Sequence, residues 1–217
     1  MDNTTTIITT TNGGKEACKL YFAYGSNLSS TQMASRCPRA TAVGLAHLPG
    51  WDWIINERHY ANVVRRPSQK EGKIKKKDEC PGVYGVLYRL PPADEITLDI
   101  CEGVPVAYQK LTLEVAVVND KKAAKPGSAG DDDDEDDSKE ESTTAAATTT
   151  TVEALVYVDL NNVRSAGPKP EYVGRMSRGV AEAHGAWGFP IWFADRVMKK
   201  YVPGLDWEGA AAAGLRN

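Results

Sequence analysis

Two short stretches of the chain hold residue types that can bind an anion and move a proton. In the first, Tyr24-Gly25-Ser26-Asn27-Leu28, an apolar aromatic run ends abruptly in small and polar residues. Successive backbone N–H groups in such a turn can face one concavity, and a helix beginning there adds partial positive charge. This pattern suits a carboxylate better than a nucleotide phosphate, because no P-loop lysine or dinucleotide fingerprint is present. The alternative is an ordinary strand-to-helix turn.

The second stretch is Leu98-Asp99-Ile100-Cys101-Glu102-Gly103. Glu102 ends an apolar helical pattern, and Gly103 is a typical helix-stop residue. An ionised carboxylate is unfavourable beside the negative end of a helix dipole, so this position, with partial burial, predicts a raised pKa. Such a group suits general base catalysis near neutral pH. The alternative is an exposed glutamate of no consequence.

A third candidate, Tyr172, follows Pro168-Lys169-Pro170 at the start of an expected helix. It is expected either to hold a ligand or to cap the core. Arg175 and Arg178 share its helix face and are expected to form a solvated surface.

Other kinds of catalysis find little support in the sequence. The three histidines do not stand at metal-ligand spacing, and no cysteine or serine sits in a nucleophile motif. We therefore expect no metal and no covalent intermediate.

These candidates must be positioned by the elements around them, and the pattern between the breaks is mostly strands. Alternating, β-branched and aromatic runs predict strands at Lys19–Tyr24, Ala40–Leu48, Trp51–Asn56, Tyr60–Arg65, Val83–Leu90, Lys110–Val118 and Val152–Leu160. Helices are expected at Ser29–Cys37, with Ser29 or Ser30 as its N-cap, and at Ala93–Cys101, Glu171–His184 and Pro190–Tyr201. This order predicts an α+β domain, built as a small, mostly antiparallel β-barrel with flanking helices.

The domain limits follow from composition. Residues 1–17 are expected to be a disordered N-terminus, 18–205 a single domain, and 206–217 a tail. Residues 119–150 form a low-complexity insertion, which becomes an overgrown hairpin loop if the strands on either side of it pair.

Charge is unevenly spread along the chain. The net charge is −3, and residues 131–141 carry −8, which leaves +5 for the remainder. A mildly basic body fits an anionic small molecule and is too weak for nucleic acid. With no membrane-spanning run and no signal or transit pattern, we expect a cytoplasmic protein, a monomer or homodimer.

Several motifs in this order resemble the γ-glutamylcyclotransferase family, fungal members included. The motifs are YFAYGSNL (Tyr21–Leu28), MASRCP (Met33–Pro38), INERHYANVV (Ile55–Val64), GVYGVLYRL (Gly82–Leu90), LDICEGVPVAY (Leu98–Tyr108) and PKPEYVGRM (Pro168–Met176). The resemblance covers about residues 19–200, apart from a Lys-rich loop at 67–81 and the insertion.

The resemblance implies a small barrel fold and a lyase or acyltransferase-type reaction in glutathione metabolism. The α-amine of a γ-glutamyl amino acid or peptide attacks the γ-carbonyl, releasing an amine and leaving 5-oxoproline, without metal or cofactor. By resemblance, Glu102 is catalytic. The positions that resemble the family's substrate-binding residues are Tyr21, Phe22, Ala23, Tyr24, Gly25, Ser26 and Tyr172.

Three other functions stay open at this point. One is a γ-glutamylamine cyclotransferase, which acidic residues beyond Glu102 would favour, whereas basic residues would favour an amino-acid leaving group. Another is the trimming of glutathione adducts in secondary metabolism, and the third is a non-catalytic binding module. The aromatic segment Trp187–Phe193 departs from the family pattern and is expected to reshape the leaving-group pocket.

Overall fold

A computed structural model describes residues 17–67, 82–118 and 150–214 of the chain. Its strands are β1 (Lys19–Ala23), β2 (Thr41–Pro49), β3 (Trp51–Ile55), β4 (Ala61–Arg65), β5 (Gly82–Leu90), β6 (Gln109–Val118) and β7 (Thr151–Val158). Its α-helices are α1 (Ser30–Arg36), α2 (Pro92–Glu102), α3 (Pro170–Trp187), α4 (Ile191–Arg196) and α5 (Trp207–Gly214). Two short 3-10 helices, η1 (Ser26–Leu28) and η3 (Met198–Lys200), complete the description.

Five strands close into a barrel in the order β1-β5-β2-β6-β7. All neighbours are antiparallel except β1 and β7, which run parallel and meet at Tyr21 and Leu155. A bulge between Ala42 and Gly44 of β2 shifts the register, and bulges increase local twist. The α+β barrel expected from the sequence is therefore confirmed.

Strands β3 and β4 form a separate two-stranded sheet, paired from Trp51 with Arg65 to Ile55 with Ala61. This hairpin follows β2 after a turn in which Gly50 adopts a φ of 77°, a conformation that favours glycine. Its buried side chains, Trp53 and Ile55 among them, belong to the main core. The hairpin thus places Ala61 and the residues just before it against the barrel.

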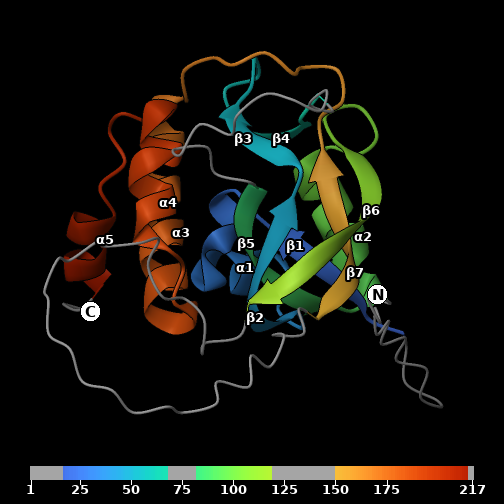
Figure 1. Ribbon diagram of the computed structural model, residues 1–217. Coiled ribbons are helices and arrows are strands. Elements are labelled where there is room, and N and C mark those ends of the chain that lie inside the picture. The colour runs from blue at the N-terminus through green and yellow to red at the C-terminus, as the bar shows by residue number, and fades with distance from the viewer. Residues whose placement is uncertain (1–16, 68–81, 119–149, 215–217) are drawn as a thin grey trace, which may run out of the picture.

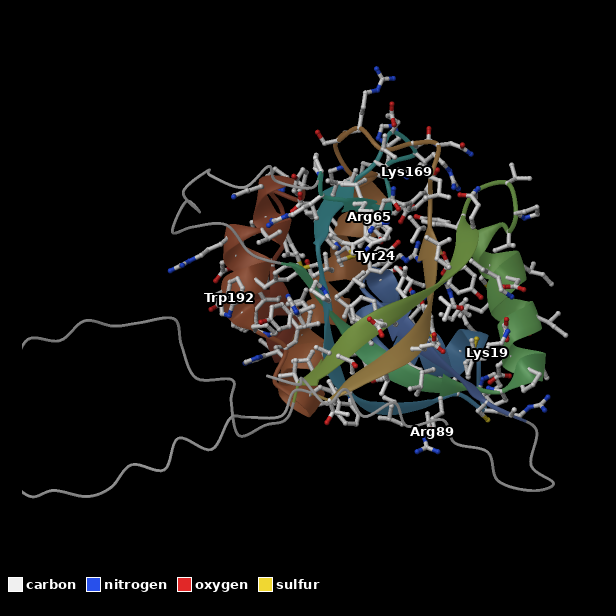
Figure 2. All side chains as sticks on the ribbon, turned by 45° about the vertical axis from the view of Figure 1, so that its right-hand side comes forward. Lys19, Tyr24, Arg65, Arg89, Lys169 and Trp192 are labelled. Atoms are coloured by element: carbon white, nitrogen blue, oxygen red, sulfur yellow. The ribbon has the colours of Figure 1, made fainter. Side chains whose placement is uncertain are left out.

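The helices cover two sides of the barrel. Figure 1 shows α3, α4 and α5 on one side of the strands and α2 on the other. Helix α3 packs on both η1 and α5. Ser29 caps α1 by accepting a hydrogen bond from the Gln32 amide at 3.0 Å, as the sequence predicts. The core combines aliphatic side chains with several aromatic rings. Figure 2 shows Tyr24 inside the molecule while Arg89 points outward.

The observed strands and α-helices match the expected ones within one or two residues, apart from three larger differences. The expected helix at Pro190–Tyr201 is split, because α4 ends at Arg196 and only the 3-10 turn η3 follows. The expected tail contains α5, built largely from alanine, the residue with the highest helix propensity. The break after Glu171–His184 lies at Gly188, so α3 runs on to Trp187.

The expected hairpin is present, because β6 pairs with β7 from Gln109 with Val158 to Ala116 with Thr151. The insertion between these strands, the Lys-rich loop and the N-terminal segment lie almost entirely outside the described residues. Within the described ranges, no helix has the length and apolar character needed to cross a bilayer.

Candidate active site

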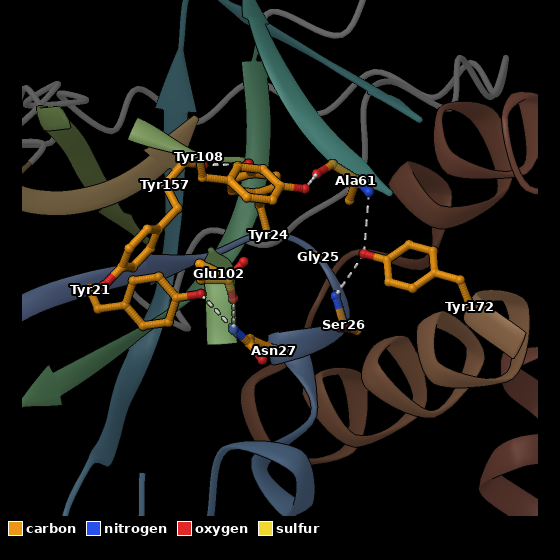
Figure 3. A pocket seen from close by; sticks show the side chains of 10 residues that line it. All are labelled: Tyr21, Tyr24, Gly25, Ser26, Asn27, Ala61, Glu102, Tyr108, Tyr157 and Tyr172. Atoms are coloured by element: carbon orange, nitrogen blue, oxygen red, sulfur yellow. Dashed lines mark hydrogen bonds between the residues drawn. The ribbon is translucent and has the colours of Figure 1, made fainter. Parts of the chain in front are cut away.

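A pocket opens where β1 ends and α2 ends, at one end of the barrel. Figure 3 shows the side chains that line it, drawn from β1, η1, β4, α2, β7, α3 and the residue before β6. The lining residues are Tyr21, Tyr24, Gly25, Ser26, Asn27, Ala61, Glu102, Tyr108, Tyr157 and Tyr172. Five of the ten are tyrosines, so the wall is aromatic but carries hydroxyl groups that can bond to a polar ligand.

One edge of the pocket is the backbone of Gly25–Asn27, which we call the lip. The lip turns tightly, because the Leu28 amide donates to the Gly25 carbonyl at 2.9 Å. A side chain at position 25 would crowd its neighbours, since its Cβ would lie 3.0 Å from the Tyr172 hydroxyl and 3.2 Å from Ala61 Cβ. The glycine therefore lets the lip approach Tyr172 closely.

The lip only partly matches the expected anion nest. The Ser26 amide donates to the Tyr172 hydroxyl at 3.3 Å, so this N–H already has a partner. Within the described residues, the amides of Gly25 and Asn27 have no acceptor. Those two donors, rather than a continuous Gly25-Ser26 pair, are the ones left for a ligand.

Glu102 is the carboxyl group of the pocket and the last residue of α2. Gly103 follows it at a φ of 66°, the left-handed conformation that ends a helix, as expected. Burial raises the pKa of Glu102 above its ordinary value, and the nearby Arg36 guanidinium and the Asn27 hydrogen bond oppose this only in part. The negative end of the α2 dipole acts in the same direction as burial.

The Glu102 carboxylate is oriented by Asn27. The Asn27 amide nitrogen donates to Glu102 Oε1 at 3.0 Å and to the Tyr21 hydroxyl at 2.9 Å. The side-chain oxygen of Asn27, Oδ1, accepts from Gln32 at 2.7 Å and from Arg36 at 3.1 Å. These two bonds fix the orientation of the Asn27 side-chain amide. Arg36 Nη1 also lies 3.6 Å from Glu102 Oε1.

The tyrosines of the pocket stay protonated, because burial raises the pKa of Tyr21, Tyr24, Tyr108, Tyr157 and Tyr172. Several hydroxyl groups are used within the fold: Tyr24 donates to the Tyr157 carbonyl at 2.6 Å, and Tyr108 to the Ala61 carbonyl at 2.8 Å.

Two of these tyrosines differ from the rest. The Tyr172 hydroxyl accepts from the amides of Ser26 and Ala61, both at 3.3 Å, and the Tyr21 hydroxyl accepts from Asn27. Neither hydroxyl donates to an acceptor in the part of the chain that the structure describes. Tyr21 and Tyr172 therefore have an O–H hydrogen available for a bound molecule.

Arg175 differs from its expected place on a solvated face. Its Nη2 donates to Ser26 Oγ at 2.8 Å and its Nε to Gln32 Oε1 at 3.0 Å. Its guanidinium carbon lies 5.2 Å from the centre of the Tyr172 ring. The Arg175 side chain thus connects α3 to the lip, whereas Arg178 remains exposed as expected.

The structure brings most of the predicted site residues together. Tyr21, Tyr24, Gly25, Ser26, Glu102 and Tyr172 line one pocket, while Phe22 and Ala23 are fully buried in the core and do not line it. Reasoning from the sequence missed Asn27 as an orienting side chain, together with Ala61, Tyr108 and Tyr157. Asn27 stands in the quoted motif and was the easiest to find, because a buried amide needs partners for both ends.

The aromatic segment Trp187–Phe193 lies elsewhere. Trp192 and Phe193 meet the Tyr84 ring of β5 with centroid separations of 5.7 and 5.5 Å, and no residue of the segment lines the pocket. The expectation that it reshapes the leaving-group pocket is not met, because its rings pack against the outside of the barrel. Among the described residues, no group of three or more His, Cys, Asp or Glu is arranged to hold a metal ion.

Comparison with known proteins identifies the protein family. A family model described as gamma-glutamyl cyclotransferase, AIG2-like, matches residues 21–129, half of the chain. The chain belongs to this family. A more particular relative is gamma-glutamyl cyclotransferase gliK of Aspergillus fumigatus, which is 27% identical over 120 residues. That match covers 50% of this chain and 44% of the relative, so it spans less than half of the relative's length.

Solved structures show the same fold. A human protein described as uncharacterized protein loc79017 has a TM-score of 0.56 at 19% identity, covering 83% of this chain and 86% of its own. A structure named gamma-glutamyl cyclotransferase gives 0.55 at 19% identity, covering 82% and 85%. YkqA of Bacillus subtilis gives 0.54 at 17% identity, covering 87% of this chain and 55% of its own. At these identities the likeness is one of fold.

Proposed function

We propose that this protein converts γ-glutamyl amino acids or peptides into 5-oxoproline and a free amino acid or amine. The observation that carries the proposal is Glu102, a half-buried carboxyl whose pKa is raised by desolvation and which lines the same pocket as the lip. Family membership supports cyclotransferase activity in general. The substrate and the roles of the residues are inferred from the chemistry of the pocket.

Glu102 supplies the proton transfers that the reaction needs. The substrate α-nitrogen is an ammonium group at neutral pH and cannot attack until it loses a proton. A carboxylate with a raised pKa accepts that proton more readily than an ordinary glutamate. As the lactam forms, the α-nitrogen loses two protons in all, and the departing nitrogen gains two to become an ammonium ion. Glu102 relays them and ends unchanged.

The bond changes are those of an intramolecular acyl transfer. A bond forms between the α-nitrogen and the γ-carbonyl carbon, and the bond from that carbon to the departing nitrogen breaks. Holding the two reacting atoms together removes much of the entropic barrier, although closure of a five-membered ring already has part of this advantage. The pocket's remaining task is to bind the charged groups that flank the reacting centre.

The free donors of the pocket are suited to oxygen atoms with negative charge. Two kinds of donor are available: the backbone N–H groups of Gly25 and Asn27, and the hydroxyl groups of Tyr21 and Tyr172. They can bind the substrate α-carboxylate and the oxyanion that forms on the γ-carbonyl. A donor preorganised on an oxyanion contributes about 3–4 kcal/mol in other acyl-transfer enzymes. Arg175, bonded to Ser26 at the edge of the lip, adds positive charge there.

The proposal is tested by incubating the purified protein with a panel of γ-glutamyl amino acids and measuring 5-oxoproline by chromatography. We expect 5-oxoproline and the free amino acid in equal amounts. If folded protein yields no 5-oxoproline from any member of the panel, the proposed function is wrong and the binding-module alternative takes its place.

A further inference from the structure

Arg58 lies at the edge of the pocket on the side of Tyr108. Its guanidinium carbon stands 5.3 Å from the centre of the Tyr108 ring, and Tyr108 is part of the pocket wall. Arg58 belongs to the tight turn between β3 and β4, one of the motifs that the reaction described above does not use. A cation over an aromatic ring at this distance is held in a defined place.

The turn that carries Arg58 is fixed by Asn56. The Asn56 amide pairs with the Tyr60 carbonyl at 2.9 Å, and its side-chain oxygen accepts from the Arg58 amide at 3.0 Å. Asn56 is fully buried and donates through its side chain to Asp159 Oδ2 at 2.9 Å. The backbone under Arg58 is therefore anchored to β7's end rather than free to swing.

Asp159 attracts Arg58 without engaging its donors. The carboxylate is fully buried and accepts from neutral amide groups of Asn56, Asn161 and Asn162 at 2.9 to 3.2 Å. Arg58 Nη1 is a buried atom 3.6 Å from Asp159 Oδ2, too far for a hydrogen bond, and it has no hydrogen-bond partner among the described residues. About a third of the Arg58 side chain, 34%, remains exposed.

The other two arginines near the pocket already donate hydrogen bonds to protein side chains. Arg36 donates to Asn27, and Arg175 donates to Ser26 and Gln32. The Arg58 guanidinium makes no hydrogen bond within the described part of the chain, yet its charge reaches the reacting centre, since it helps to hold down the pKa of Glu102. Of the three arginines, Arg58 is the one whose guanidinium makes no hydrogen bond within the described residues.

We propose that Arg58 is a specificity-determining residue that binds a carboxylate on the leaving group of the substrate. The planar guanidinium group pairs with a carboxylate through two hydrogen bonds. A leaving group without a carboxylate, such as that of a γ-glutamylamine, cannot accept this pair of bonds. The preferred substrate is then a γ-glutamyl amino acid or peptide rather than a γ-glutamylamine. This inference rests on the proposed function and names the leaving group of that same reaction.

A purely structural role for Arg58 makes a different prediction. If the side chain only offsets the buried charge of Asp159, its loss weakens the fold and lowers activity equally for every substrate. If it binds the leaving group, its loss acts on one class of substrate. The ratio between two substrates therefore separates the roles, because instability cancels from it.

Two compounds that differ by one carboxylate provide the test. γ-Glutamyl-alanine and γ-glutamyl-ethylamine carry the same leaving group with and without that carboxylate. For the wild type we expect kcat/KM to favour γ-glutamyl-alanine by roughly 10- to 100-fold, the range for hydrogen bonds to a charged group. Arg58→Met should bring this ratio close to one, because the loss of activity is larger on γ-glutamyl-alanine than on γ-glutamyl-ethylamine.

Two further variants keep the test decisive. Arg58→Lys retains the charge beside Asp159 but not the planar fork, so it should fold and keep only part of the preference. Arg164→Met is the matched control, since Arg164 pairs with the neighbouring Glu57 and its side chain is 87% exposed; it should leave the ratio unchanged.

The outcomes distinguish this inference from the proposed function. A wild type that uses both compounds equally, or Arg58 variants that lose activity on both in proportion, would overturn the role of Arg58 while 5-oxoproline formation stands. If the wild type makes no 5-oxoproline from either compound or from the wider panel, the proposed function itself has failed.

Discussion

Replacing Glu102 by glutamine tests the chemistry with little disturbance of the pocket. The glutamine carbonyl oxygen can take the place of Oε1 and accept from Asn27, which lies 3.0 Å away in the wild type. The side chain keeps its size, so the lip and the tyrosines should stay in place. The variant loses the ability to accept a proton and little else.

The expected loss falls on turnover rather than on binding. A positioned general acid–base group is worth roughly 10²- to 10⁴-fold in rate, so we expect kcat to fall by at least about 100-fold, or about 2.7 kcal/mol of transition-state stabilisation. KM should change only a few-fold. The assay is the initial rate of 5-oxoproline formation, with Glu171→Gln as the control, because that carboxylate is 55% exposed and does not line the pocket.

Stability should change with pH in the opposite sense to that of a carboxylate whose pKa is lowered by ion pairs, such as Glu95. Because burial raises the folded-state pKa of Glu102, its contribution is fully present below the unfolded pKa, about 4.3, and is lost as pH rises through the folded pKa. The melting temperature of Glu102→Gln should therefore gain on that of the wild type as pH rises through this window. Undiminished activity in the variant, or a melting difference independent of pH, would refute the role assigned to Glu102.

Three further predictions concern the surroundings of this carboxyl group. Arg36→Met removes a cation that lowers the pKa of Glu102, so the rising limb of kcat/KM against pH should move to higher pH, whereas a limb that stays in place would contradict the pairing. Tyr172→Phe leaves two buried backbone amides without their acceptor and should cost about 1–3 kcal/mol in urea unfolding; a cost near zero would mean that water replaces the hydroxyl. Replacing residues 121–149 by a short turn should leave kcat/KM within a few-fold, since the Thr150 carbonyl already meets the β6 backbone at 2.8 Å. Loss of activity in that variant would show that the insertion contributes to the site.

Local chemistry made much of the fold predictable. Three local signals each predict one element from a few residues. They are the alternation in β6, the capping serine before α1 and the glycine after Glu102, and each feature is present where expected. The tail helix α5 was overlooked because alanine and glycine give no apolar period, although alanine propensity was itself a signal. The end of α4 at Arg196 could not be predicted, because neither glycine nor proline stands between α4 and η3.

The site was predictable only where its residues are contiguous. The lip and Glu102 stand in short motifs, but the partners that orient them come from far away in the chain. Arg175 reaches Ser26 across 149 positions, and helical periodicity alone placed it on a solvated face. Tertiary packing decides which face of a helix contacts polar partners. A local sequence pattern does not predict this.

The β6–β7 hairpin has a practical consequence for how the protein tolerates change. Tyr108 and Tyr157 lie at the pocket end of the hairpin, whereas Ala116 pairs with Thr151 near its other end. Gln109 and Ala116 are seven positions apart along β6, roughly 23 Å at the rise of an extended chain. The hairpin thus offers an attachment point for reporter domains or affinity tags far from the substrate. We therefore expect changes of chain length at this end to leave the catalytic residues at the other end in place.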